Sequence, residues 1–255
     1  MVRFGSFLVA ATVWFVAAEA SSQAAEIKVL TAGAYKQVVL ALVPAFEKQT
    51  GNKVILDNGT VGQLKKRVAG GEAFDLLVAT PAAIDELTQA GKLAAGSEVK
   101  LATVGIGVAV KQGAPKPDIG TVDKLKQALL AAKSVAYIDP ASGGSSGVYV
   151  DRLLVKLGIA DQIRPKAKLK KGGLVAEWVA DGTAELGIHQ ISEIVAVKDV
   201  TLVGPLPKDI QNTTTYAVAL GAAAKNKDAA AAFIKTLSGP TAATVLKAKG
   251  MEPAT

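Results

Sequence analysis

Short apolar runs alternate with segments in which apolar residues recur every three or four positions along most of the chain. The runs have the length of buried strands, and the spaced segments are typical of helices that bury one face. This alternation predicts an α/β fold. The predicted strands are residues 27–31, 53–57, 74–79, 101–110, 134–138, 184–188, 200–203 and 213–220. The predicted helices are residues 35–50, 63–69, 121–132, 148–157, 227–237 and 240–249, and of two further helices one begins at Thr80-Pro81 and the other contains Trp178.

Two stretches divide this pattern into two regions. The apolar run 101–110 is long, contains glycines and leads into the turn-rich segment Gly113–Pro117. Segments rich in glycine and proline often mark domain boundaries. We therefore expect the chain to pass from a first region to a second one here, and to return along residues 213–220.

The first residues resemble an export signal. Arg3 precedes an apolar run from Phe4 to Ala18, and small residues suited to cleavage follow it. The run is shorter than the ~20 residues that a membrane-spanning helix needs. We expect residues 1–25 to be removed and the protein to be periplasmic.

Composition narrows the classes of partner. The chain has no cysteine, which excludes disulfides, thiolate metal sites and cysteine nucleophiles. Its formal net charge of +7 favours anionic partners. Because an exported chain with few aromatic residues is a poor candidate for nucleic-acid binding, we expect a small anionic solute.

The segment Asp139–Gly147 is the first candidate for an anion site. Its glycines allow sharp turns, and Ser145, Ser146 and Gly147 lie just before a predicted helix, where unpaired N–H groups favour anions. A flexible connector with an ordinary serine cap is the alternative. Lys171 and Gly172 precede a second predicted helix and are either ligand contacts or part of a solvated face.

His189 and Gln190 follow a predicted strand. Ligands of parallel α/β folds collect at the carboxyl ends of strands, so both side chains are candidate contacts. Residues 143–147 also read Gly-x-Ser-x-Gly, which permits a secreted serine hydrolase with Ser145, His189 and either Asp161 or Asp181. Against that reading, several residues separate the strand from Ser145, whereas a nucleophile elbow follows its strand directly.

Taken together, the segments resemble type 2 periplasmic solute-binding proteins of ABC importers, in particular the molybdate-binding branch. The resemblance spans nearly all of the mature chain and rests on Ile27–Ala34, Pro44–Gly51, Gly59–Leu64, Phe74–Ala79, Asp139–Pro140 with Gly147 and Tyr149, and Gly182–Gly187.

The resemblance implies a two-lobed fold in which each lobe is a mostly parallel sheet flanked by helices, with two crossing strands between the lobes. Residues 26–104 and 214–255 would form one lobe and residues 105–213 the other. The lobes would close on a solute in the manner of a hinge. A membrane permease would be the partner of this monomer, and neither a catalytic residue, a cofactor nor a metal is expected. A sensor on the same scaffold stays an alternative.

Molybdate binders of this family hold the oxyanion with serines at two positions that are Ala34 and Val61 here. Because a hydrogen bond to a charged group contributes ~1.5–3 kcal/mol, these changes favour an organic di- or tricarboxylate over molybdate or tungstate. His189 stands where the family has a tyrosine. The expected ligand-binding residues are Ala34, Tyr35, Thr60, Val61, Ser145, Ser146, Gly147, Lys171, Gly172, His189 and Gln190.

Overall fold

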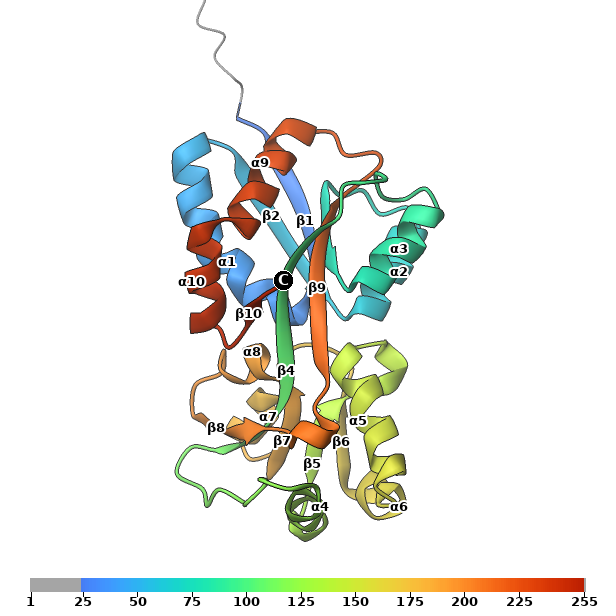
Figure 1. Ribbon diagram of the computed structural model, residues 1–255, viewed down its shortest axis with the longest axis vertical. Helices are drawn as coiled ribbons and strands as arrows, with labels where there is room; N and C mark the ends of the chain where they lie inside the picture. The colour runs from blue at the N-terminus through green and yellow to red at the C-terminus, as the bar shows by residue number, and fades with distance from the viewer. Residues whose placement is uncertain (1–23, 255) are drawn as a thin grey trace, which may run out of the picture.

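The computed structural model describes residues 24–254, so almost all of the leader expected at residues 1–25 lies outside the described residues. Strands and helices alternate along the chain (Figure 1). The strands are β1 (Glu26–Ala32), β2 (Lys53–Gly59), β3 (Leu76–Ala79), β4 (Val99–Lys111), β5 (Val135–Ile138), β6 (Ala167–Lys170), β7 (Leu186–Gln190), β8 (Val200–Pro205), β9 (Thr213–Leu220) and β10 (Glu252–Pro253).

The helices are α1 (Gly33–Thr50), α2 (Val61–Ala69), α3 (Pro81–Gln89), α4 (Val122–Ala131), α5 (Ser145–Lys156), α6 (Ala160–Ile163), α7 (Ala176–Ala180), α8 (Ile191–Ile194), α9 (Lys227–Ser238) and α10 (Pro240–Ala248). Short 3₁₀ turns lie at η1 (Pro140–Ser142), η2 (Arg164–Lys166) and η3 (Lys208–Ile210). Across residues 24–254, no helix has both the length and the apolar character that crossing a bilayer requires.

The strands confirm the predicted mixed α/β fold. They follow the order β2-β1-β3-β9-β4-β7-β5-β6, with β8 and β10 also paired to β4. The pairs β1–β2, β1–β3, β5–β6 and β5–β7 are parallel. Strands β4 and β9 run antiparallel to each other and to the neighbours on either side of them. Two parallel groups therefore flank a central antiparallel pair.

Strand β4 belongs to both groups. Its residues up to Gly105 pair with β9, and those from Ile106 onward pair with β7 and β8. The Gln211 amide fixes this transition, because it accepts from the Ile106 N–H and donates to the Ile106 carbonyl, both at 2.9 Å. Figure 1 shows β4 and β9 running between the two groups of elements. The lobe boundaries expected at residues 104/105 and 213/214 remain predictions.

Each group of strands buries its own apolar side chains. Around β1, helix α1 packs against α9 and α10, with the Phe46 and Phe233 rings 4.7 Å apart. Leu125, Tyr137 and Val150 belong to a separate buried cluster between β5 and the helices α4 and α5. The described chain thus has a distinct apolar core on each side of the transition at Ile106.

Several helix starts differ from the prediction, and those of α5 and α7 differ most in their consequences for the glycine-rich segments. Helix α5 begins at Ser145 instead of Val148, so the serines of the glycine-rich segment form its first turn. This turn packs tightly on the preceding strand, since a Cβ atom at Gly147 would lie 2.1 Å from the Ile138 carbonyl oxygen. Helix α7 begins only at Ala176, after a turn through Gly173 with φ of +78°.

Candidate functional site

A small cavity lies where the first turns of helices from both groups meet the ends of β7 and β9. It encloses about 30 Å³, which is room for about two water molecules. Backbone and small side chains form much of its wall. The lining residues are Ala32, Gly33, Ala34, Asn58, Gly59, Thr60, Val61, Ile138, Gly144, Ser145, Ser146, Gly173, His189, Gln190, Glu193 and Tyr216.

Three helix N-termini reach this cavity. Gly33 and Ala34 begin α1, Val61 begins α2, and Ser145 and Ser146 begin α5. The first N–H groups of a helix have no partner within it, and the helix dipole adds partial positive charge at the same point. No lysine or arginine is among the described lining residues, so the positive potential of this cavity comes from the main chain.

His189 and Glu193 form a buried pair in the wall. His189 lies near the end of β7, and α8 follows at once, which places Glu193 one helical turn later. His189 Nε2 lies 3.1 Å from Glu193 Oε2, and the two side chains are 2% and 8% exposed. Burial, and secondarily the charge of Lys170, lowers the pKa of His189 to about 3. Burial raises the pKa of Glu193 to about 8.

The two ring nitrogens of His189 have different surroundings. Nε2 of His189 faces Glu193 Oε2 at 3.1 Å, while Nδ1 of the same ring has no hydrogen-bond partner. A Cβ atom at Gly33 would lie 2.6 Å from Glu193 Oε1, so the carboxyl rests directly on the first residue of α1. A buried polar nitrogen without a partner is rare, which makes Nδ1 a candidate for contact with a ligand.

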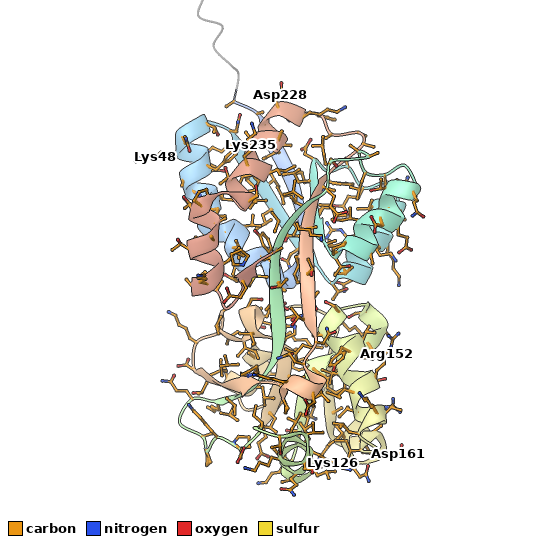
Figure 2. The ribbon with its side chains drawn as sticks, viewed as in Figure 1. Lys48, Lys126, Arg152, Asp161, Asp228 and Lys235 are labelled. Carbon is orange, nitrogen blue, oxygen red and sulfur yellow. The ribbon has the colours of Figure 1, made fainter. Side chains whose placement is uncertain are left out.

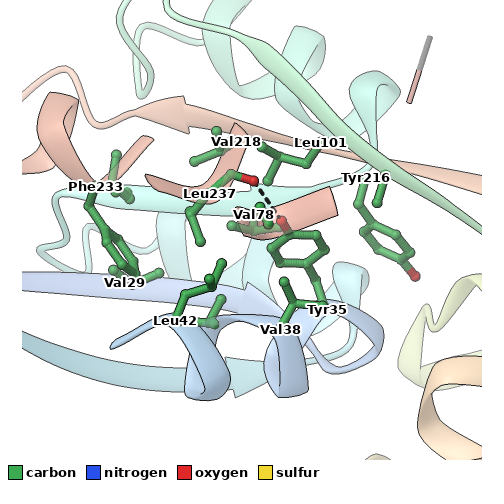
Figure 3. Close-up of a cluster of buried hydrophobic side chains, with 14 of the residues drawn as sticks. Val29, Tyr35, Val38, Leu42, Val78, Leu101, Tyr216, Val218, Phe233 and Leu237 are labelled. Atoms are coloured by element: carbon green, nitrogen blue, oxygen red, sulfur yellow. Dashed lines mark hydrogen bonds between the residues drawn. The ribbon is translucent and has the colours of Figure 1, made fainter. Parts of the chain in front are cut away.

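The remaining polar side chains connect the central strands to the cavity. The Gln190 amide donates to Thr214 Oγ1 at 3.0 Å, and the Tyr216 hydroxyl lies 3.2 Å from Ser145 Oγ. Burial, reinforced by the charge of Glu193, raises the pKa of the Tyr216 hydroxyl well above its usual value. Figure 3 shows that this hydroxyl points away from the apolar cluster around α1.

Direct contacts close the cavity on the side of α2. The Gly62 N–H donates to the Gly143 carbonyl at 3.1 Å, and the Gln63 amide donates to the Lys171 carbonyl at 2.9 Å. The Thr60 hydroxyl donates to the Ser142 carbonyl. A Cβ atom at Gly62 would lie 2.8 Å from Gly143 Cα, so this approach requires glycine. We call these contacts the latch.

The sequence matches a known family over most of its length. The model of the family described as bacterial extracellular solute-binding protein aligns with residues 27–252. The chain belongs to this family. The resemblance to its molybdate-binding branch is confirmed by a molybdate-binding protein ModA of Azotobacter vinelandii, which is 32% identical over 90% of this chain and 91% of that protein.

A solved structure has the same fold as this protein. The periplasmic molybdate-binding protein of Azotobacter vinelandii superposes with a TM-score of 0.75, covering 90% of this chain and 100% of that one. Its sequence identity in the superposition is 20%, so the likeness is one of fold.

One relative corrects the expectation that the protein is not an enzyme. An aconitate isomerase of a Pseudomonas species is 33% identical over 99% of this chain and 95% of that protein. Because that relative is an enzyme and matches end to end, the expectation of a purely non-catalytic binding protein is wrong. That expectation was based on the family resemblance alone, and enzymes and binding proteins share this fold.

Most of the ligand-binding residues that the sequence predicts lie around the cavity. Ala34, Thr60, Val61, Ser145, Ser146, His189 and Gln190 line it. Thr60 also caps α2, accepting from the Gln63 N–H while the Gln63 side chain accepts from the Thr60 N–H. Which of these residues bind ligand remains a prediction.

Four expected residues lie outside the cavity lining. Tyr35 is buried in the apolar core, where its hydroxyl donates to the Leu237 carbonyl at 3.2 Å (Figure 3). Gly147 packs on Ile138 in the first turn of α5. Lys171 has an exposed side chain and contributes its carbonyl to the latch, and Gly173 lines the cavity in place of Gly172. The short α7 starts too late for Lys171 to lie at its N-terminus.

Sequence reasoning missed Glu193 and Tyr216. Glu193 stands four positions after His189, a spacing that aligns side chains only if a helix begins immediately after the strand. Tyr216 lies on the strand expected to return between regions, and strands that cross the middle of this fold pass the cavity. The spacing of Glu193 and the position of Tyr216 were both visible in the sequence. Recognising them required knowing where α8 begins and how β9 crosses the fold.

The alternative serine hydrolase is not assembled. Ser145 Oγ pairs with Tyr216, and His189 Nε2 pairs with Glu193. Asp161 and Asp181 are exposed, and Figure 2 places Asp161 at the outer end of the molecule. A nucleophile needs a base within hydrogen-bond reach that is oriented by an acid, and Ser145 has no such partner among residues 24–254.

Proposed function

We propose that the protein is an enzyme that interconverts the geometric isomers of an aconitate-type tricarboxylate by moving a proton along its carbon skeleton. The observation that carries this proposal is the buried His189–Glu193 pair beside a cavity that three helix N-termini line. The aconitate isomerase relative, similar over 99% of this chain, supports it. The cavity supplies both an anion site and a group that can exchange a proton.

The walls favour a carboxylate over a tetrahedral oxyanion. Ala34 and Val61 bring main-chain N–H groups without hydroxyls. Each missing hydrogen bond to a charged group costs ~1.5–3 kcal/mol, so molybdate would bind more weakly by about two to four decades. Their apolar side chains instead contact the carbon skeleton of an organic acid.

His189 is the proposed base. When its Nε2–H donates to Glu193, the unpartnered Nδ1 holds the lone pair. Burial keeps the ring uncharged before binding, as the lowered pKa of His189 indicates. A bound trianion favours the charged imidazolium and so raises the pKa of His189 at the moment when it must accept a proton.

The reaction then needs no outside reagent. Nδ1 removes a proton from the methylene carbon, and the electron pair forms a new double bond to the central carbon. The former double bond breaks, and its far carbon receives the proton from the imidazolium. Because the old methylene carbon can rotate before the bond forms, the product is the other geometric isomer. The helix N–H groups stabilise the negative charge that builds up on the carboxylate beside the carbanion.

Substrate entry requires the two groups of elements to separate. A cavity of about 30 Å³ is several times too small for a tricarboxylate. Each group has its own apolar core, and β4 and β9 link them, so the groups can act as the two lobes of a hinged binding protein. The latch contacts of Thr60, Gly62 and Gln63 would break on opening.

Turnover in deuterium oxide tests this function. The chain without residues 1–25 is incubated with cis-aconitate or trans-aconitate, and proton NMR follows both isomers. We expect each isomer to yield the other, with deuterium entering the vinyl and methylene positions through His189. Stable isomers without deuterium exchange would contradict the proposal. Isomerisation without exchange would mean that the imidazolium returns the same proton, and isomerisation that persists in His189→Asn would contradict the mechanism.

A second role follows from family membership. We propose that the protein works in the periplasm and can present its solute to an ABC permease, as bacterial extracellular solute-binding proteins do. Binding is measured by the fluorescence of Trp178, the one tryptophan among residues 24–254. We expect tricarboxylates to bind more tightly than molybdate, and the reverse order would favour an oxyanion carrier.

A further inference from the structure

Gln190 is the second side chain of the cavity wall with an unused polar atom. It is 1% exposed, its Nε2 donates to Thr214 Oγ1 at 3.0 Å, and its Oε1 has no partner. A buried acceptor without a donor is destabilising, because it has lost its hydrogen bonds to water. The Gln190 amide at the end of β7, beside His189, is therefore destabilising unless a ligand forms a hydrogen bond with it.

The amide can present either end to the cavity. Its oxygen and nitrogen ends have nearly the same shape, and a threonine hydroxyl can both accept and donate. Asn212 Nδ2 lies 3.5 Å from Thr214 Oγ1, which occupies a lone pair and leaves the hydroxyl proton free. When the Thr214 hydroxyl donates to the Gln190 oxygen, the amide NH₂ takes the unpartnered position. An NH₂ group there matches an anion, whereas an oxygen would repel it.

We propose that Gln190 is a specificity-determining residue that donates its amide NH₂ to one carboxylate of the bound tricarboxylate, and that Thr214 is the positioning residue that turns the amide this way. This inference rests on the proposed tricarboxylate ligand. The Gln190 amide would read one of the three carboxylates, while His189 serves the reacting carbons. A dicarboxylate without that group leaves the amide unpaired.

Thr214 suits this positioning role. It is 7% exposed and lies on β9, one of the two central strands, so its hydroxyl is held by the sheet and not by a loop. Valine has the same shape without the hydroxyl, and serine keeps the hydroxyl. The pair Thr214→Val and Thr214→Ser therefore separates the hydrogen bond from the packing.

Binding of an unreactive ligand tests the inference apart from turnover. The ligand is propane-1,2,3-tricarboxylate, compared with glutarate and methylsuccinate, each of which lacks one of its carboxylates. For the wild type we expect the tricarboxylate to bind most tightly. In Gln190→Met its affinity should fall about tenfold or more, while the affinity for one of the dicarboxylates stays within about twofold, because that dicarboxylate never used the amide.

The variants of Thr214 supply the second readout. We expect Thr214→Val to weaken tricarboxylate binding several-fold, Thr214→Ser to restore it, and Thr214→Val to add nothing in the Gln190→Met background. For aconitate turnover, Thr214→Val should raise KM with kcat nearly unchanged. Equal losses for all three ligands, or no loss for any, would overturn the role of Gln190, and additive effects of the two substitutions would overturn that of Thr214. Wild-type protein that binds the tricarboxylate but does not isomerise aconitate would refute the proposed function alone.

Discussion

The two sides of the cavity contribute different chemistry. On one side, Gly33, Ala34 and Val61 begin α1 and α2 and offer little beyond main-chain N–H groups. On the other side, β7 and α8 supply His189 and Glu193, which can titrate or exchange protons. We infer that the first side holds an anion through its main chain, whereas the second side adds the groups that can move a proton and, through Gln190, a side-chain contact to the ligand. Substitutions on the two sides should therefore have separable effects.

Replacing the base should have the largest effect. We expect His189→Asn to lower kcat for aconitate isomerisation by about 10²–10⁴-fold, because proton transfer by a positioned side chain contributes that much. Binding of propane-1,2,3-tricarboxylate, measured by calorimetry, should change only a few-fold. Tyr35→Phe is the matched control, since it deletes a buried hydroxyl outside the cavity. Equal turnover by the Asn variant and the wild type would remove His189 from the reaction.

The opposite side is tested by restoring hydroxyls. In the double variant Ala34→Ser with Val61→Ser, two new donors would face an oxyanion at the N-termini of α1 and α2. We expect molybdate affinity to rise by about a hundredfold, as two hydrogen bonds to a charged group predict. The tricarboxylate should gain less, because it loses apolar contact. Trp178 fluorescence measures both affinities, and an unchanged preference would show that these positions do not select the anion.

The proposed closure of the two sides is tested at the latch. In Gly62→Ala the new Cβ would lie 2.8 Å from both Gly143 Cα and the Ser142 carbonyl oxygen, and both are backbone atoms that cannot move aside easily. We expect tricarboxylate affinity to fall about tenfold, with faster release in stopped-flow measurements. Gly204→Ala is the control, because its Cβ would make only an ordinary 3.8 Å contact with Ile119. Similar release rates in the two variants would argue against a closing role.

The sequence predicted the side of the cavity formed by α1 and α2 better than the side formed by β7 and α8. The strands and helices around Thr60 follow from alternating apolar runs, and the family resemblance then pointed to Ala34 and Val61. The helices were expected two residues later than they begin, at residues 35 and 63. The start of α5 at Ser145 was missed by three residues, since serine and glycine favour loops and only packing on Ile138 makes them helical.

The paired chemistry of the site could not be predicted for a physical reason. His189 was recognisable as the single histidine at a strand end, but its partner Glu193 depends on α8, a helix of only four residues. So short a helix has no apolar period to detect. Burial of Glu193 against Gly33 joins residues from distant parts of the chain, and local patterns carry no information about such a contact.

The charge of Glu193 gives the smallest predicted effect and the most specific one. Burial raises the pKa of this carboxyl to about 8, so it is uncharged below that pH and anionic above it. A negative charge in the cavity repels a trianion. We therefore expect tricarboxylate affinity to be constant near neutral pH and to fall several-fold, up to about tenfold, by about pH 9. In Glu193→Gln the affinity should stay constant over this range, and calorimetry across the pH series measures it.

The same titration should appear in stability. Because the pKa of Glu193 is raised in the folded state, its contribution to stability is fully present at acid pH and is lost as the pH rises through about 8. Glu193→Gln should therefore melt at a higher temperature than the wild type at about pH 9, with a smaller advantage at about pH 5. Glu252→Gln, which neutralises an exposed carboxylate outside the cavity lining, should show no such trend. A parallel pH dependence in all three proteins would mean that Glu193 is charged throughout this pH range. The interpretation of His189 and Glu193 as an uncharged pair would then be wrong.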